Sequence, residues 1–262
     1  MSAIPRAVAG WQIVPELVRR DIRVRFAGAR FGLLWSILNP SIQLASYSLI
    51  FGYLYRGPGE ETGSAFVASL FCGLWPWWGF QEGVMRGLSS LVDQSALLRR
   101  VPMAPSACVV AAVTSAFVLQ AVGFALFLAV FAFLGIISPS VGWLALPAIA
   151  LVGWLLALAA SLVLAPLHLV IRDTVHVVSA ILLLGFFLSP VLYSTQWLPP
   201  AAQALAALNP MTGLLGLYRW AVLGVPLPSA LASLALGIAI LVLSVLARTV
   251  FGRLRPLLDE YW

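Results

Sequence analysis

The segment Arg19–Pro40 reads RRDIRVRFAGARFGLLWSILNP, and it joins a strongly cationic stretch directly to an apolar run of membrane length. From Trp11 to Phe26, apolar residues recur at three- and four-residue spacing and arginines fall between them. This pattern predicts an amphipathic helix in the headgroup plane of a membrane, within residues 1–28. An ordinary solvated basic face is the alternative interpretation. Gly28 is the expected corner between this helix and the first span.

The composition of the whole chain extends this interpretation. Of the 262 residues 62% are hydrophobic and only 9% are charged, with a mean hydropathy of +1.02. These values indicate an all-α polytopic membrane protein. Counted against the ~20 residues that one helix needs to cross a bilayer, the apolar runs predict six transmembrane helices in a single transmembrane domain, residues 1–262. The expected spans are about 31–55, 64–81, 106–137, 143–167, 175–193 and 231–250.

Two short helical pieces are expected between the fifth and sixth spans, at about residues 201–208 and 213–222. Asn209-Pro210 separates them, and Pro199-Pro200 precedes the first. Both pieces are too short to cross a bilayer, so they are predicted to be outer-surface or re-entrant helices.

The arginine distribution predicts the orientation. Thirteen of the 15 arginines fall on one proposed side, against Arg56 and Arg219 on the other. Since basic residues accumulate in cytoplasmic loops, both termini are expected in the cytoplasm, and the net charge of +6 needs no nucleic-acid partner. The N-terminus shows no signal-peptide pattern, so the first span is expected to direct insertion.

The sequence indicates that the energy for any transport comes from another subunit. It contains no lysine, which excludes a Walker A nucleotide site. Glu82 is the only acid placed for a proton relay, and it lies at a span end where it can pair with Arg86 four residues on. A partner ATPase is the economical source.

A membrane-embedded enzyme of lipid or glycan metabolism is the second function class. The only candidate cluster for such chemistry is His168, Asp173 and His176. Arg172 lies between the two histidines on one helix face and would repel a cation, so no metal site is predicted. A structural or assembly protein of the membrane is the third class.

Four segments, in order along most of the chain, resemble the membrane subunits of ABC-2 type exporters, which carry polysaccharides such as O-antigen and teichoic acid out of bacteria. The segments are RVRFAGARFGLLWSILNPSIQLASY (23–47), LLRRVPMAP (97–105), IRDTVHVVSAILLLGFFLSPVLYSTQWLPP (171–200) and LNPMTGLLGLYRWAVLG (208–224). Permeases for capsular polysaccharide share much of this plan, so the class of glycan stays open.

The resemblance implies a homodimer of six-span subunits in the bacterial inner membrane. Two copies of a cytosolic ABC ATPase would bind ATP and Mg, while this chain would hold no cofactor of its own. A lipid-linked polysaccharide, for example the O-antigen of lipopolysaccharide, would pass between the two permeases, with membrane lipid around them.

The resemblance also implies roles for particular residues. Contacts with the ATPase would come from Arg19, Arg20, Arg23, Arg25, Arg86, Asp93, Arg99 and Arg100. The outer gate would include Pro199, Pro200, Asn209, Pro210 and Arg219. Aromatic faces stack on sugar rings, and the candidates to line the channel are Trp35, Tyr47, Phe71, Trp75, Trp77 and Trp78. For the tryptophans of the second span, packing between helices or an inner interfacial belt of aromatic residues is the alternative.

Overall fold

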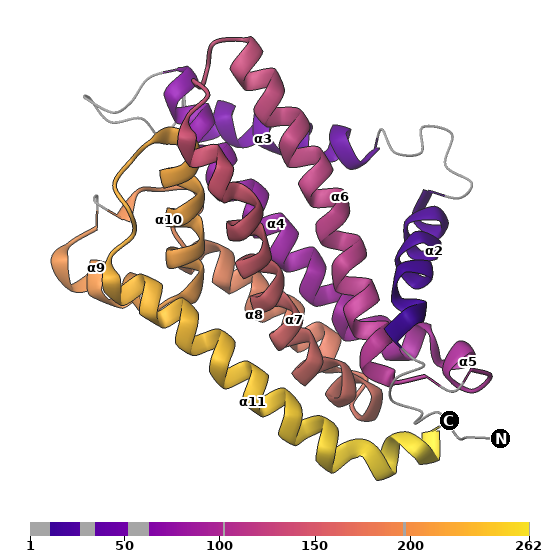
Figure 1. Ribbon diagram of the computed structural model, residues 1–262. Helices are drawn as coiled ribbons and strands as arrows, with labels where there is room; N and C mark the ends of the chain where they lie inside the picture. Colours follow the sequence, from indigo (N-terminus) through magenta and orange to yellow (C-terminus); the bar gives the residue numbers. More distant parts are fainter. Residues whose placement is uncertain (1–10, 27–34, 52–62, 102, 196–197, 262) are drawn as a thin grey trace.

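The computed structural model describes residues 11–26, 35–51, 63–101, 103–195 and 198–261, and all regular structure within these ranges is helical (Figure 1). This architecture confirms the all-α fold class. The helices are η1 (Trp11–Ile13), α2 (Val14–Phe26), α3 (Trp35–Leu49), α4 (Ser64–Asp93), α5 (Ser95–Leu98), α6 (Pro105–Phe133), η4 (Val141–Ala145), α7 (Leu146–Val170), α8 (Thr174–Leu188), α9 (Pro200–Ala207), α10 (Pro210–Leu223) and α11 (Ala230–Tyr261).

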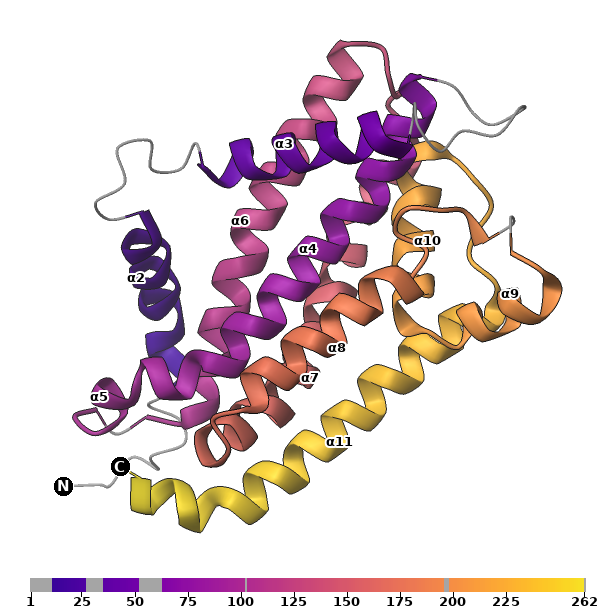
Figure 2. The same cartoon turned by 180° about the vertical axis from the view of Figure 1, so that it is seen from behind.

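Helix α4 lies at the centre of the bundle, with α6 and α7 packed against it (Figures 1 and 2). Glycines on α4 allow these neighbours to come close. A Cβ atom on Gly83 would lie 2.8 Å from Cε2 of Phe117, and one on Gly87 would lie 2.8 Å from Cγ2 of Val113. Small residues at helix contacts are typical of membrane proteins, where dispersion rather than water expulsion drives helix association.

Helix α4 is longer than the sequence predicted. The predicted second span is 64–81, whereas α4 runs unbroken from Ser64 to Asp93. Leu88 and Leu91 in its second half are fully buried, so this half of α4 continues the core of the bundle. The four-residue helix α5 follows it.

Within the described ranges, three helical segments are long and apolar enough to cross a membrane: α6, η4 with α7, and α11 as far as Arg253. They fall on the predicted third, fourth and sixth spans, and α8 is a shorter apolar helix within the predicted fifth. Helix α8 ends at Leu188 because Ser189 is extended and Pro190 cannot donate to the helical ladder. Helix α11 continues to Tyr261, beyond the predicted end at residue 250.

The first predicted span, residues 31–55, is described only at residues 35–51, so its two ends and the corner expected at Gly28 lie outside the described residues. The described helix in it is α3, Trp35–Leu49. Figures 1 and 2 show α3 crossing α4 and α6 at a steep angle instead of running beside them. The helix continues through Pro40. The described part of this segment therefore covers one side of the bundle.

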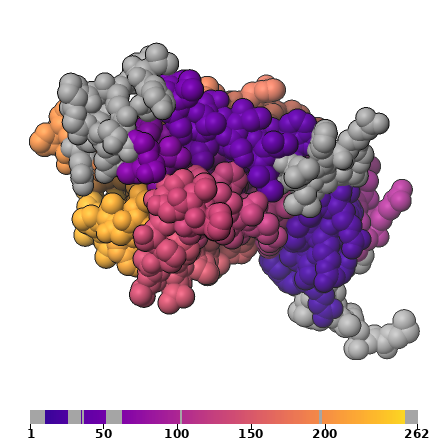
Figure 3. Space-filling model, turned by 90° about the horizontal axis from the view of Figure 1, so that it is seen from above, coloured from indigo at the N-terminus to yellow at the C-terminus, as the bar shows by residue number. Residues whose placement is uncertain are grey.

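Helix α2 confirms the helix predicted near the start of the chain. From above, it forms a lobe beside α6, away from α9 and α11 (Figure 3). Leu17 is buried, and Ile13, Val14 and Val18 are partly buried in the same cluster. Part of the apolar face that was predicted to meet lipid headgroups is therefore covered by protein.

The two short helices predicted after α8 are present as α9 and α10. Pro199 and Pro200 open α9, and Pro210 opens α10, because proline is pre-organised for a first helical turn. The Asn209 side chain caps α10 by accepting a hydrogen bond of 3.0 Å from the backbone nitrogen of Met211.

Candidate functional site

A groove of about 530 Å³ opens where α3 crosses α4, near α6 and α8. Its lining is rich in aromatic rings and side-chain amides. The rings belong to Trp35, Tyr47, Trp75, Trp78 and Phe186, and the amides to Asn39, Gln43, Gln81 and Gln120. Rings offer flat apolar faces, and each amide can both donate and accept hydrogen bonds. This combination suits ring-shaped ligands that carry many hydroxyl groups.

Four of the six aromatic residues predicted to line a path meet in this groove, from Trp35 and Tyr47 on α3 to Trp75 and Trp78 on α4. The other two are absent from the groove lining. Phe71 is 1% exposed, and its ring stacks on that of Phe124 with centroids 4.9 Å apart.

Trp77 is the second aromatic residue that lies away from the groove. It is 2% exposed, and its Nε1 donates to Oε1 of Gln81 at 3.2 Å. Packing between helices, the alternative considered for the tryptophans, is therefore what the structure shows for Trp77.

Trp75 belongs to both the core and the groove. Its indole Nε1 donates to the backbone carbonyl of Gln120 at 3.0 Å, and the Gln120 amide donates back to the carbonyl of Trp75. Gly123 leaves room for the ring, since a Cβ atom there would lie 2.5 Å from Cζ2 of Trp75. These contacts fix the indole against α6, so the groove has a rigid floor.

Two ion pairs connect α2 with α4 beside the groove. Nη1 of Arg25 lies 2.5 Å from Oε1 of Glu82, and Nη2 of Arg86 lies 2.5 Å from Oδ2 of Asp21. The members are four residues apart on each helix, so the pairs are one turn apart, and we call them the α2–α4 ladder. Ser115 of α6 donates a second hydrogen bond to the same Asp21 oxygen.

The ladder changes the interpretation of Arg25 and Arg86, which were predicted to contact a partner. Both bind within the chain, and Glu82, expected to pair with Arg86 on its own helix, pairs with α2 instead. The four side chains are only 23–35% exposed, so water screens these pairs less than it screens surface pairs. The ladder therefore attaches α2 to the central helix of the bundle.

The other predicted ATPase contacts are exposed. They lie on α2, at the end of α4 and just after α5: Arg19, Arg20, Arg23, Asp93, Arg99 and Arg100. Arg19 pairs with Glu16 at 2.7 Å, and Asp93 accepts a hydrogen bond of 2.7 Å from Ser89. Helices α2 and α5 lie near each other at one end of the bundle (Figure 1), so these charges form a surface that a partner can reach.

Two of the predicted gate residues, Asn209 and Arg219, hold the turn that follows α8. Nδ2 of Asn209 donates to Oγ of Ser189 at 2.9 Å. Nη2 of Arg219 donates to the carbonyl oxygens of Pro190 at 2.7 Å and Val191 at 3.2 Å. Asn209 at the start of α10 and Arg219 in its last part therefore both bind the turn that follows α8.

The residues of the enzymatic alternative do not form a cluster. His168 is buried in α7, and its Nδ1 has no hydrogen-bond partner in the described part of the chain. Asp173 and His176 are exposed at the start of α8. Within the same ranges, no side-chain hydrogen bond or ion pair joins the three residues.

Sequence reasoning missed Gln81 and Gln120 in the groove, and the bonds that Asp21 makes. The available signal was a polar side chain inside an apolar run, which at membrane depth marks an inward-facing position. That signal identifies Gln120, but nothing local identifies Ser115 as the partner of Asp21, because 94 residues separate them.

The fold and the site define a multi-pass helical membrane protein that has no nucleotide-binding motif of its own. The sequence profile of the ABC-2 type transporter family matches residues 14–223, and the chain belongs to this family. It is thus a transport subunit without an ATPase domain and without a cofactor of its own, and membership implies a partner ATPase.

Three curated relatives show which members of the family this chain is similar to. The chain is 32% identical to the O-antigen export system permease protein RfbA of Myxococcus xanthus over 241 residues, which cover 90% of each protein. It is 24% identical to RfbA of Klebsiella pneumoniae over 213 residues, 80% of this chain and 79% of that protein. It is also 32% identical to the polysialic acid transport protein KpsM of Escherichia coli over 98 residues, 37% of each.

Proposed function

We propose that this chain is the permease subunit of an ATP-driven exporter that moves lipid-linked polysaccharide of the O-antigen type across the bacterial inner membrane. The groove of aromatic rings and amides carries this proposal, because it has the chemistry to hold sugar rings without reading their sequence. The similarity to RfbA over 90% of the chain supports the same substrate class.

The assembly is a homodimer with two copies of the ATPase. The exposed charges of α2, the end of α4 and α5 face the cytoplasm and bind the ATPase, and both termini lie on that side. The bias of 13 arginines against two supports this orientation. The turn held by Asn209 and Arg219 then lies on the outer side, next to the gate helices α9 and α10.

The groove forms part of the glycan path. Each ring gives a sugar a flat surface on which to stack, while the amides exchange hydrogen bonds with its hydroxyl groups. Conduction through a path requires sites that bind well enough for entry and weakly enough for release. An open groove lined by several rings meets this requirement better than one deep pocket.

The test is export by the purified chain and its ATPase, reconstituted together in liposomes. ATP hydrolysis should rise when lipid-linked O-antigen is added, and Trp78→Ala should lower both this stimulation and export. Phe133→Ala is the control, because Phe133 is an aromatic residue that is 91% exposed and absent from the groove lining. A chain that binds no ATPase, or equal effects of the two substitutions, would contradict the proposal.

A permease for capsular polysaccharide is the second candidate, favoured by the 98-residue similarity to KpsM. The same liposomes distinguish the two, because an acidic capsular polymer would then stimulate ATP hydrolysis more than lipid-linked O-antigen does. A teichoic acid substrate is tested in the same liposomes, by adding teichoic acid and comparing its stimulation of ATP hydrolysis with that by lipid-linked O-antigen.

A further inference from the structure

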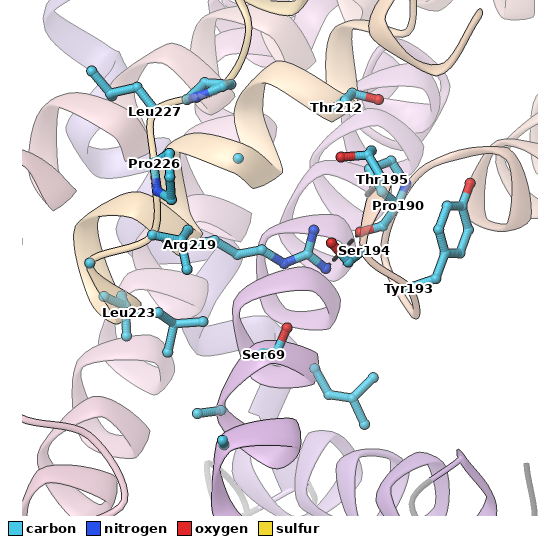
Figure 4. Close-up of a pocket in the computed structure, with 18 of the residues that line it drawn as sticks. Ser69, Pro190, Tyr193, Ser194, Thr195, Thr212, Arg219, Leu223, Pro226 and Leu227 are labelled. Carbon is cyan, nitrogen blue, oxygen red and sulfur yellow. Dashed lines mark hydrogen bonds between the residues drawn. The ribbon is translucent and has the colours of Figure 1, made fainter. Parts of the chain in front are cut away.

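A second cavity, of about 880 Å³, lies at the end of the bundle opposite the α2–α4 ladder. The start of α4, the α6–η4 connection, the turn after α8, helix α10 and the α10–α11 connection line it (Figure 4). Its volume lies within the range of about 300–1,000 Å³ that is usual for small-molecule sites.

Arg219 is the one charged residue among the described residues that line this cavity. Its Nη2 donates to the carbonyls of Pro190 and Val191, which fixes the guanidinium in place. Its Nε is buried and has no hydrogen-bond partner, and its Nη1 makes no hydrogen bond with any residue that the structure describes. Three N–H donors are therefore unused, and the positive charge has no counter-ion within that part of the chain.

The α4 backbone passes very close to the guanidinium. A Cβ atom on Gly73 would lie 3.1 Å from Nη2 of Arg219, so only glycine leaves this space. Ser69 lies one turn earlier on the same face of α4 and lines the cavity. Figure 4 shows Ser69 and Ser194 near the guanidinium.

Hydroxyl groups dominate the polar lining. The hydroxyl-bearing residues are Ser69, Ser138, Ser140, Tyr193, Ser194, Thr195, Thr212 and Ser229. A hydroxyl has one hydrogen to donate, and Ser140, Tyr193 and Thr212 already donate theirs to backbone carbonyls. Other hydroxyls, such as that of Ser69, can donate to an anion, and no carboxylate among the described lining residues would repel one. The cavity thus combines a fixed cation, spare N–H donors and neutral hydroxyls.

We propose that this cavity binds a phosphate group, held by the unused Nη1 donors of the Arg219 guanidinium and by the surrounding hydroxyls. Nη1 can donate two hydrogen bonds to phosphate oxygens, and a partly desolvated cation without a counter-ion gains most from such a ligand. The phosphate comes from a phospholipid headgroup or from the lipid end of the exported glycan. Only the second source rests on the proposed function.

The full chain, purified in neutral detergent without its ATPase, is titrated with farnesyl phosphate, short-chain phosphatidylglycerol, inorganic phosphate and the neutral alcohol farnesol. Binding of the phosphate compounds with no binding of farnesol is the expected result. Tighter binding of farnesyl phosphate indicates that the ligand is the lipid end of the exported glycan. Tighter binding of phosphatidylglycerol indicates a phospholipid headgroup, and equally tight binding of inorganic phosphate indicates a site for the free ion. Farnesol binding as tightly as farnesyl phosphate, or no binding of any phosphate compound, would overturn the proposal.

Arg219→Gln should lower the affinity for the preferred phosphate compound by about tenfold or more, as expected when a charge-assisted hydrogen bond is lost. Arg172→Gln, which removes an exposed charge from the turn before α8, should leave the affinity unchanged. Equal affinities of wild type and Arg219→Gln would refute the role of the guanidinium.

Because Arg219 also holds the turn after α8, its loss can impair folding, and a second pair of variants leaves this contact intact. Ser69→Glu places a carboxylate in the cavity and should abolish phosphate binding, whereas Ser69→Gln should preserve it. Unchanged binding by Ser69→Glu would overturn the proposal even if Arg219→Gln does not fold.

Export is measured separately, so failures of the two proposals are distinguishable. Phosphate binding that depends on Arg219 in a chain that exports no glycan would keep the site and reject the proposed function. Glycan export together with no phosphate binding would keep the proposed function and reject the phosphate site.

Discussion

Replacing Asp21 with asparagine should loosen α2 from the bundle. The carboxylate accepts hydrogen bonds from Arg86 and Ser115, and Nε of Arg86 is already buried without a partner. The substitution therefore leaves the guanidinium without its counter-ion. A hydrogen bond to a charged group contributes about 1.5–3 kcal/mol. Since the Asp21 side chain is 23% exposed, solvent screening reduces the expected loss to about 1–2 kcal/mol.

This loss predicts faster hydrogen exchange of the α2 amides, by about 5- to 30-fold, because exchange follows the opening equilibrium of the helix. The measurement is exchange mass spectrometry on the purified chain in lipid nanodiscs. Glu16→Gln is the matched control, since it breaks an ion pair on the same helix whose members are both 65% exposed. Its expected cost is below about 1 kcal/mol.

A double-mutant cycle with Arg86→Gln separates the pair from its surroundings. If the ladder acts as described, the double variant should exchange little faster than Asp21→Asn alone. Strictly additive effects, or equal exchange in Asp21→Asn and Glu16→Gln, would show that Leu17 and its apolar neighbours hold α2 without the ladder.

Four further substitutions test the packing and the local structure. Trp77→Ala should lower the unfolding free energy by about 3–5 kcal/mol, because it empties a fully buried position, whereas Trp35→Ala in the groove wall should cost much less in a thermal melt. Asn209→Ala should cost about 0.5–2 kcal/mol through loss of the α10 cap, with faster exchange in the first turn of that helix. Gly87→Leu should destabilise the chain by at least about 1–3 kcal/mol, because a Cβ atom at this position would lie only 2.8 Å from Cγ2 of Val113. A lower melting temperature would show this loss.

The sequence predicted α9 and α10 closely because their signals are local. Prolines at first helical positions and an asparagine cap act within a few residues, and the predicted ranges 201–208 and 213–222 match α9 and the body of α10. The long apolar helices α6, α7 and α11 were recoverable for a similar reason, since length and composition alone identify them.

The continuation of α4 was missed because its cause is not local. Glu82 and Arg86 look like the start of a solvated loop, and charged residues usually mark the end of a membrane span. Their partners lie on α2, 57 and 65 residues away in sequence respectively. Once Arg25 and Asp21 neutralise them, the helix can pass this point and bury Leu88.

The groove was predicted only in part for the same physical reason. Aromatic residues were correctly recognised as a group, but hydropathy cannot tell Trp77, which faces the core, from Trp78, which lines the groove. Their separation depends on the path of α3 across α4. That path sets which face of α4 is covered by helices and which face remains open.

The ladder and the groove share residues, and this has a mechanical consequence. Arg25 and Glu82 form one ion pair of the ladder and also line the groove. Glu82 is one helical turn from Trp78 on the same face of α4, so a displacement of α2 that breaks the pair reaches the ring-lined wall directly. Trp75, by contrast, is fixed to α6 by its bonds with Gln120 and should stay in place. A force applied to α2 therefore changes the groove by moving one wall against a fixed floor. The end of the bundle that we propose binds the ATPase is thus connected to the proposed glycan path through the ladder itself, without a longer chain of contacts through the bundle.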